Sequence, residues 1–109
     1  MDKGFKKLSD LFAGDQELIV SVLSIAKKQL QSFHKDLASA VEQEDLEALH
    51  FIGHKLYGTA ATIGMDDLAA LAKVAEHLKK HDNVQELGNR ISDEVENALT
   101  RISLQYPDV

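Results

Sequence analysis

Apolar residues recur at spacings of three and four along most of the chain, and this helical period limits the fold more than any other feature. No segment of the sequence has the alternation of apolar and polar residues that is typical of a half-buried strand. Short turn signals separate the segments that carry the helical period. Because short turns favour antiparallel neighbours, we expect an all-α, antiparallel up-down four-helix bundle with a short additional N-terminal helix.

The first two helices are expected on either side of Gly14 and Asp15. The short first helix should place one apolar side on the bundle: Phe5, Leu8, Leu11 and Phe12. Asp15 has a side chain suited to an N-cap, and a long helix without Pro or Gly is expected to follow it over residues 16–41. Its buried face should consist of the apolar residues at helical spacing: Leu18, Val22, Ile25, Leu30, Phe33, Leu37 and Val41.

The third and fourth helices are expected on either side of Gly64. Asp45 should cap the third helix, Gly64 should end it, and Asp66 should cap the fourth. The third helix carries one apolar stripe: Leu46, Leu49, Gly53, Leu56, Ala60 and Ile63. The fourth carries another: Leu68, Leu71, Ala75 and Leu78. Its last turn should contain basic side chains, which suit the helix dipole there: Lys79, Lys80 and His81.

The last helix is expected to begin after Asn83, which forms a capping pair with Glu86. It should extend to about Leu104, before the single proline of the chain, Pro107. Its buried face should consist of six apolar residues at helical spacing: Val84, Leu87, Ile91, Val95, Leu99 and Ile102. Because the sequence has no internal repeat and no low-complexity linker, we expect one helical domain over residues 1–109.

Composition excludes several classes of protein. Apolar residues make up 44% and charged residues 28% of the chain, which is typical of a soluble protein. The net charge of −6 argues against nucleic acid or an anionic membrane as the main partner, because both favour an excess of Lys and Arg. The longest uncharged run, Leu56–Met65, is too short to span a bilayer. With no signal peptide visible, we expect a cytoplasmic protein.

His54 is the most unusual residue of the third helix. At roughly 100° per residue, it projects about 130° from the centre of the apolar stripe, toward the side that should face solvent. Its neighbours are His50, Phe51, Gly58 and Ala61, so the surface is small and apolar where a helix usually carries charge. A glycine within a helix costs roughly 1 kcal/mol relative to alanine, which suggests that something approaches the backbone at Gly58. An exposed histidine beside such a cleared surface is a candidate nucleophile.

Residues 54–64, HKLYGTAATIG, resemble the signature of histidine-containing phosphotransfer (HPt) domains, in which His-x-Leu-Lys-Gly precedes small residues and a glycine. The resemblance extends through residues 14–18, 40–46 and 68–76, and so covers most of the chain. It implies that His54 accepts a phosphoryl group on Nε2 as an intermediate of a two-component phosphorelay. Imidazole suits this role because its ring nitrogen is a nucleophile near neutral pH and a good leaving group afterwards.

The ring of His54 should need a partner, since only one nitrogen can attack while the other holds the proton. The resemblance implies that a Gln or Glu on the next helix accepts the Nδ1 proton, and Glu76 is the matching residue. Glu76 projects roughly 110° from the apolar stripe of its helix, on a flank that would border His54 if the two helices are antiparallel neighbours. The alternative is a solvated surface glutamate without a role.

The sequence departs from the family pattern at Tyr57, where a lysine or arginine usually stands three residues after the histidine. The resemblance implies that this cation attracts the phosphoryl oxygens. Because tyrosine offers a hydroxyl but no charge, that role is weakened or moved, unless Tyr57 simply packs. Lys55 projects roughly 100° away from His54 and is expected to serve the partner's surface or no function. The expected docking face consists of the following residues: Phe51, Lys55, Tyr57, Gly58 and Ala61.

Two other functions compete with a phosphorelay. His50 and His54 are spaced for zinc, as are His77 and His81. A di-iron bundle, however, needs two Glu-x-x-His motifs and two further glutamates, whereas the motif occurs once, at Glu47–His50, off the core stripe. We therefore expect no metal site. The other alternative is a non-catalytic adaptor bundle, which would not require a histidine at position 54.

The sequence contains neither a P-loop nor the magnesium-binding residues of a kinase. Another protein must therefore donate the phosphoryl group and another must receive it. The resemblance implies that these partners are receiver domains of a hybrid sensor histidine kinase and of a response regulator, which supply an aspartate and Mg²⁺. We expect a monomeric phosphocarrier without a cofactor of its own, and not an enzyme, because the receiver contributes most of the catalysis.

Overall fold

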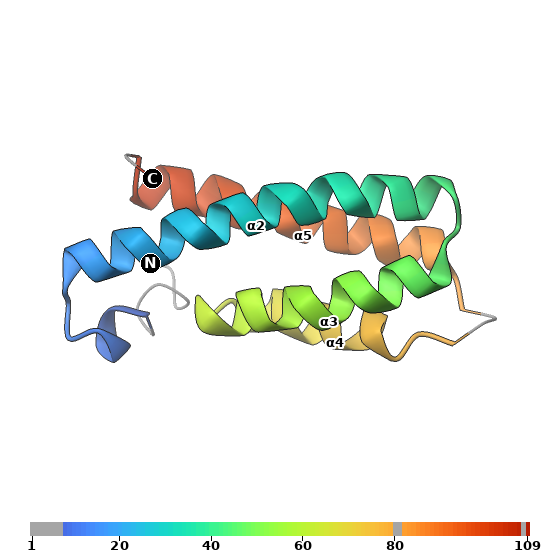
Figure 1. Cartoon of the computed structure of the whole chain (residues 1–109), viewed down its shortest axis with the longest axis horizontal. Coiled ribbons are helices and arrows are strands. Elements are labelled where there is room, and N and C mark those ends of the chain that lie inside the picture. Colours follow the sequence, from blue (N-terminus) through green and yellow to red (C-terminus); the bar gives the residue numbers. More distant parts are fainter. Residues whose placement is uncertain (1–7, 80–81, 108) are drawn as a thin grey trace.

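The computed structural model describes residues 8–79, 82–107 and 109. Within them, residues 8–11 are helical, and four longer helices follow: α2 (Gln16–Glu42), α3 (Leu46–Thr62), α4 (Asp66–Glu76) and α5 (Val84–Gln105). These helices run alternately in opposite directions along a molecule of 45 × 21 × 20 Å (Figure 1). Because the described residues also contain no strand, the predicted all-α up-down bundle is confirmed. No described helix is long and apolar enough to cross a membrane.

The predicted N-caps of α2, α3 and α5 are confirmed. In each, a side-chain oxygen accepts a hydrogen bond from the backbone N–H three residues later: Asp15 from Leu18, Asp45 from Ala48 and Asn83 from Glu86. These bonds satisfy donors that the first turn of a helix otherwise leaves unpaired. Since each bond closes within four residues, the local sequence is sufficient to predict it.

The turn between α3 and α4 confirms one expectation and corrects another. Gly64 ends α3 with φ +76°, and its N–H donates to Ala61 O while the N–H of Met65 donates to Ala60 O. This is a Schellman motif, for which glycine is suited because it lacks a Cβ. The prediction that Asp66 caps α4 is wrong: Met65 holds the N-cap position without a side-chain bond, and Asp66 lies in the first turn.

The buried face of α2 is rotated relative to the prediction. Leu18 and Ile25, expected to be buried, are 47% and 60% exposed. The predicted Leu30 and Leu37 are buried, and Val22 and Phe33 pack partly against the core. The residues that enter the core form an overlapping set with the same helical period: Ile19, Leu23, Ala26, Leu30, Leu37 and Ala40. Periodicity alone does not distinguish the two sets, and packing against α3 and α5 selects the second. In the first helix, Leu8 is buried and Leu11 is exposed, while Phe5 lies outside the described residues.

The other helices bury much of the faces that their sequences predict, while four predicted residues are only partly buried against the core: Leu71, Val84, Leu87 and Leu99. In α3 the whole stripe from Leu49 to Ile63 is buried, and Leu46 packs partly against the core. The buried residues of α4 are mostly small: Leu68, Ala69, Ala72 and Ala75. Those of α5 include a glycine: Gly88, Ile91, Val95, Ala98 and Ile102. Together the buried apolar residues form one continuous cluster between the helices.

α4 is shorter than predicted, because it ends at Glu76 and not near residue 81. Leu78 is buried but lies beyond the helix, where its carbonyl accepts a hydrogen bond from His50 Nε2 of α3. The N–H of Lys79 donates to Asp82 Oδ2 at 2.8 Å. The His50 side chain and the Asp82 side chain thus replace hydrogen bonds that another turn of helix would provide. Lys80 and His81, expected in that turn, lie outside the described residues.

Candidate functional site

A hydrogen-bonded histidine–glutamate pair lies on the surface between α3 and α4. His54 Nδ1 is 2.7 Å from Glu76 Oε2, and the side chains of the two residues are 70% and 28% exposed. The structure therefore brings together the two residues that the sequence singled out as nucleophile and orienting partner. Their roles in transfer remain predictions.

The chemistry of the pair determines which nitrogen of His54 is available. The hydrogen bond from His54 lowers the pKa of the Glu76 carboxyl, so Glu76 is a carboxylate near neutral pH. An ionised carboxylate only accepts hydrogen bonds, and Nδ1 must therefore carry the proton that it donates. In a neutral ring this leaves the lone pair on Nε2. The arrangement thus leaves Nε2 as the nitrogen with an unprotonated lone pair on a largely exposed side chain.

Close packing of α3 against α4 places the pair. A Cβ added at Gly53 would lie 2.6 Å from Ala72 O and 2.8 Å from Glu76 N, so only glycine allows this approach of the two backbones. The hydrogen bond from His50 to the Leu78 carbonyl holds the chain just beyond α4. Since these contacts lie next to His54 and Glu76 in the sequence, they fix the register that makes the pair.

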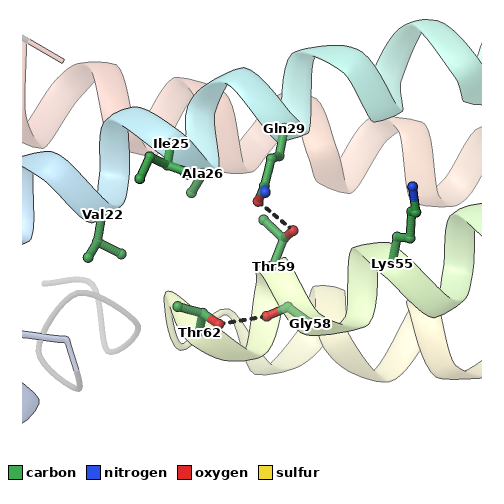
Figure 2. A pocket seen from close by; sticks show the side chains of 8 residues that line it. All are labelled: Val22, Ile25, Ala26, Gln29, Lys55, Gly58, Thr59 and Thr62. Atoms are coloured by element: carbon green, nitrogen blue, oxygen red, sulfur yellow. Dashed lines mark hydrogen bonds between the residues drawn. The ribbon is translucent and has the colours of Figure 1, made fainter.

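A groove of about 500 Å³ lies between α2 and α3, on the opposite side of α3 from Glu76, and Gly58 on its rim is one helical turn beyond His54. Its lining is mixed apolar and polar: Val22, Ile25, Ala26, Gln29, Lys55, Gly58, Thr59 and Thr62. Figure 2 shows Thr59 reaching across the groove to Gln29, whose Oε1 accepts a hydrogen bond from the Thr59 hydroxyl at 2.8 Å. Gly58 lies on the α3 side, with no atom within 4 Å of the position that a Cβ would take. The surface at Gly58, one helical turn beyond His54, is therefore open and hollowed.

The predicted docking residues all reach the surface of α3. Phe51 is 60% exposed, Tyr57 and Gly58 are exposed, and Ala61 is half-buried. Lys55 Nζ lies 4.6 Å from the centroid of the Phe51 ring, which is a cation–π distance. Tyr57 has a corresponding cation from another helix, since Lys73 Nζ of α4 lies 4.8 Å from its ring centroid.

Sequence reasoning missed the contribution of α2 to this surface. Ile25 was assigned to the core, yet its exposed side chain lines the groove together with Val22 and Gln29. One signal was available: α2 carries two adjacent apolar sets at helical spacing, more than one buried face needs. Lys73 was also missed, because its contact with Tyr57 joins two helices and leaves no local pattern.

The remaining histidines have other surroundings. His34 Nε2 lies 2.9 Å from Glu96 Oε1, which pairs α2 with α5. His50 Nε2 donates a hydrogen bond to the Leu78 carbonyl, whereas His54 Nδ1 bonds to Glu76. The two histidines therefore have different partners. Among the described residues, no group of three or more His, Cys, Asp or Glu side chains is arranged to hold a metal ion. His81, which is spaced to bind zinc together with His77, lies outside the described residues.

Comparison with known families matches residues 21–105 to the Hpt domain. The matched region contains all of α3, α4 and α5 and most of α2, and therefore both His54 and Glu76. Searches among curated proteins and solved structures found no significant match. The family match confirms the resemblance drawn from residues 54–64.

Proposed function

Because the chain belongs to the Hpt domain family, we propose that His54 accepts a phosphoryl group from the aspartyl phosphate of one receiver domain and passes it to another. Hpt domains are phosphocarriers of two-component phosphorelays that work with receiver domains and have no catalytic site of their own. One observation carries the assignment to His54: its Nδ1 lies 2.7 Å from a carboxylate, on a ring that is 70% exposed.

The transfer step follows from this geometry. The Nε2 lone pair of His54 attacks phosphorus, the Nε2–P bond forms, and the bond from phosphorus to the acyl oxygen breaks. The aspartate of the receiver leaves as a carboxylate. The proton stays on Nδ1, so the phosphorylated ring carries a positive charge that the Glu76 carboxylate stabilises at 2.7 Å. Transfer to the second receiver reverses each bond change with that receiver's aspartate as the nucleophile.

The receiver supplies what this chain lacks. Its aspartate and Mg²⁺ would position the phosphoryl group and neutralise charge in the transition state, while this chain would contribute an aligned imidazole and a surface for docking. We propose that the receiver docks on the predicted face of α3 and extends over the groove to α2. The exposed ring of Phe51 on α3 and the exposed Ile25 at the groove support this placement, since exposed apolar side chains are typical of a binding surface.

The finer assignment follows the same inference. A hybrid sensor histidine kinase is the proposed donor, a response regulator is the proposed acceptor, and the protein is proposed to act as a cytoplasmic monomer. The direction of net transfer depends on which receiver is phosphorylated.

The test is to incubate the full chain with phosphorylated receiver domains encoded in the same genome and to follow acid-labile label. Wild-type protein should become labelled, and His54→Gln should not. His34→Gln is the matched control, because His34 also forms an imidazole–glutamate hydrogen bond but lies between α2 and α5. Label that remains on the His54 variant would overturn the assignment, as would labelling that is lost equally in the His34 variant.

A further inference from the structure

Two residue pairs join α3 to α4 along one seam. His54 of α3 contacts Glu76 of α4. Three residues further along α3, Tyr57 contacts Lys73, which lies three residues before Glu76. Residues three apart in a helix lie on the same side, about one turn from each other. In antiparallel helices, these two contacts are therefore successive steps of one register, and Lys73 lies about one turn along the seam from the His54–Glu76 pair.

The Tyr57 ring limits where the Lys73 charge can be. A lysine side chain on an exposed helix surface is flexible, and its ammonium usually samples much of the nearby solvent. Here Nζ lies 4.8 Å from the ring centroid, where the negative face of the ring attracts it. An aromatic ring on α3 thus holds a positive charge from α4 about one turn along the seam from His54. Lys55 differs because its Nζ lies over Phe51, within α3, and its stem lines the groove on the α2 side.

A phosphoryl group on His54 Nε2 would bring two negative charges to this surface. Glu76 adds a third, since it is already a carboxylate. Tyr57 itself can donate one hydrogen bond but contributes no charge. A nearby ammonium would offset this repulsion both in the transition state and in the phosphorylated protein. Lys73 is a cation that the structure holds at this position.

We propose that Lys73, held over the Tyr57 ring, is the cation that attracts the phosphoryl oxygens during transfer to His54. The inference rests on the proposed function of His54. In the family pattern, the positive charge is on α3, at position 57. In this chain the proposal places it on α4, at Lys73, and gives Tyr57 the role of positioning it.

The experiment uses phosphoramidate as a small phosphoryl donor, so that receiver docking does not affect the result. His54 Nε2 attacks phosphorus, the P–N bond of the donor breaks, and ammonia leaves, while the proton stays on Nδ1. Lys73→Gln should lower the rate of phosphohistidine formation about two- to fivefold, the size expected for one charge a few ångströms away in water. Lys73→Arg should restore most of the rate. Lys35→Gln removes the same charge from an exposed site on α2 and should leave the rate unchanged.

Two further measurements separate electrostatics from structure. The difference between wild type and Lys73→Gln should shrink in roughly 1 M salt, where charges are screened within about 3 Å. Tyr57→Phe should retain more of the rate than Tyr57→Leu, because phenylalanine keeps the ring face. A wild-type rate in Lys73→Gln, or an equal loss in Lys35→Gln, would overturn the role of Lys73 while leaving His54 as the carrier. If phosphoramidate left no phosphohistidine at position 54 of the wild type, the proposed function would fail as well.

Discussion

Gly53 of α3 lies directly against the backbone of Ala72 in α4, so that a Cβ at position 53 would be 2.6 Å from the Ala72 carbonyl oxygen. Real Cβ atoms do not come so close to a backbone oxygen, and the same Cβ would also be 2.8 Å from Glu76 N. The glycine therefore allows the close approach of the two helices that carry His54 and Glu76. Stability and site geometry are coupled at this point.

Gly53→Ala should destabilise the protein by about 1–3 kcal/mol, the usual cost of inserting a methyl group into a packed interface. The contact is with backbone, so a side-chain rotation cannot relieve it. Because the helices must move apart, phosphoryl transfer to His54 should also slow. Urea unfolding and transfer rates measure the two effects, and an unchanged unfolding midpoint would contradict the close packing.

Gly58→Ala should have the opposite effect on stability. Gly58 is exposed, and no atom lies within 4 Å of an added Cβ, so alanine should stabilise the protein by about 0.5–1 kcal/mol. Gly58→Gln should keep a level or raised unfolding midpoint but transfer poorly, because its side chain would enter the groove beside His54.

The matched control for Gly58→Gln is Ala38→Gln, on an exposed α2 position outside the groove, which should transfer normally. Normal transfer by both Gly58 variants would mean that the receiver does not dock there. Easier unfolding of both would mean that Gly58 packs closely in the protein.

Glu76→Ala should slow phosphoryl transfer roughly tenfold or more, the scale seen when the partner that orients an imidazole is removed. Thermal stability should change little, since the pair lies at the surface. Glu76→Gln keeps an oxygen that accepts the Nδ1 proton and should lose less, which separates orientation from charge. Glu96→Ala breaks the comparable contact with His34 and serves as the control. A Glu76→Ala variant that transfers at the wild-type rate would return Glu76 to the role of a surface residue.

The stability of the protein should depend on pH through Glu76. Its carboxyl pKa is lowered from the ordinary 4.5, first by the hydrogen bond from His54 and then by the charges of His54, His77 and Lys73. A pKa lowered by folding stabilises the native state above the unfolded pKa, and this stability is lost as the pH falls through the folded pKa. As the pH falls from above 4.5 through the lowered pKa of the folded protein, unfolding free energy should therefore fall less in Glu76→Gln than in wild type.

Measuring unfolding free energy against pH also tests whether His54 is the group that lowers the pKa of Glu76. His54→Ala should reduce the acid sensitivity by a similar amount, and the double variant should add little, because both changes remove one contact. Additive effects of the two substitutions would show that Glu76 owes its lowered pKa to other groups.

The sequence alone determined the features that close within a few residues. Asp15, Asp45 and Asn83 were predicted as caps because each side chain reaches a backbone N–H three positions later. Gly64 was predicted to end α3 because only a residue without a Cβ adopts φ +76° without strain. His54 was predicted as the phosphoryl carrier because its place on the helix, the small residues around it and the family signature all agree. These are properties of local chemistry, so a single sequence carries them.

Only the tertiary structure decided how the apolar surface of α2 is turned toward the core. Ile19 and Ile25 each lie at helical spacing from other apolar residues of α2. Packing against neighbouring helices buries Ile19 and leaves Ile25 beside the groove. The end of α4 depends in the same way on His50, which lies 28 residues before Leu78. The Tyr57–Lys73 contact requires the register between α3 and α4, which the approach at Gly53 fixes. Helical period specifies which residues share a face of a helix. Contacts between distant segments decide whether that face packs against another helix or is exposed to solvent.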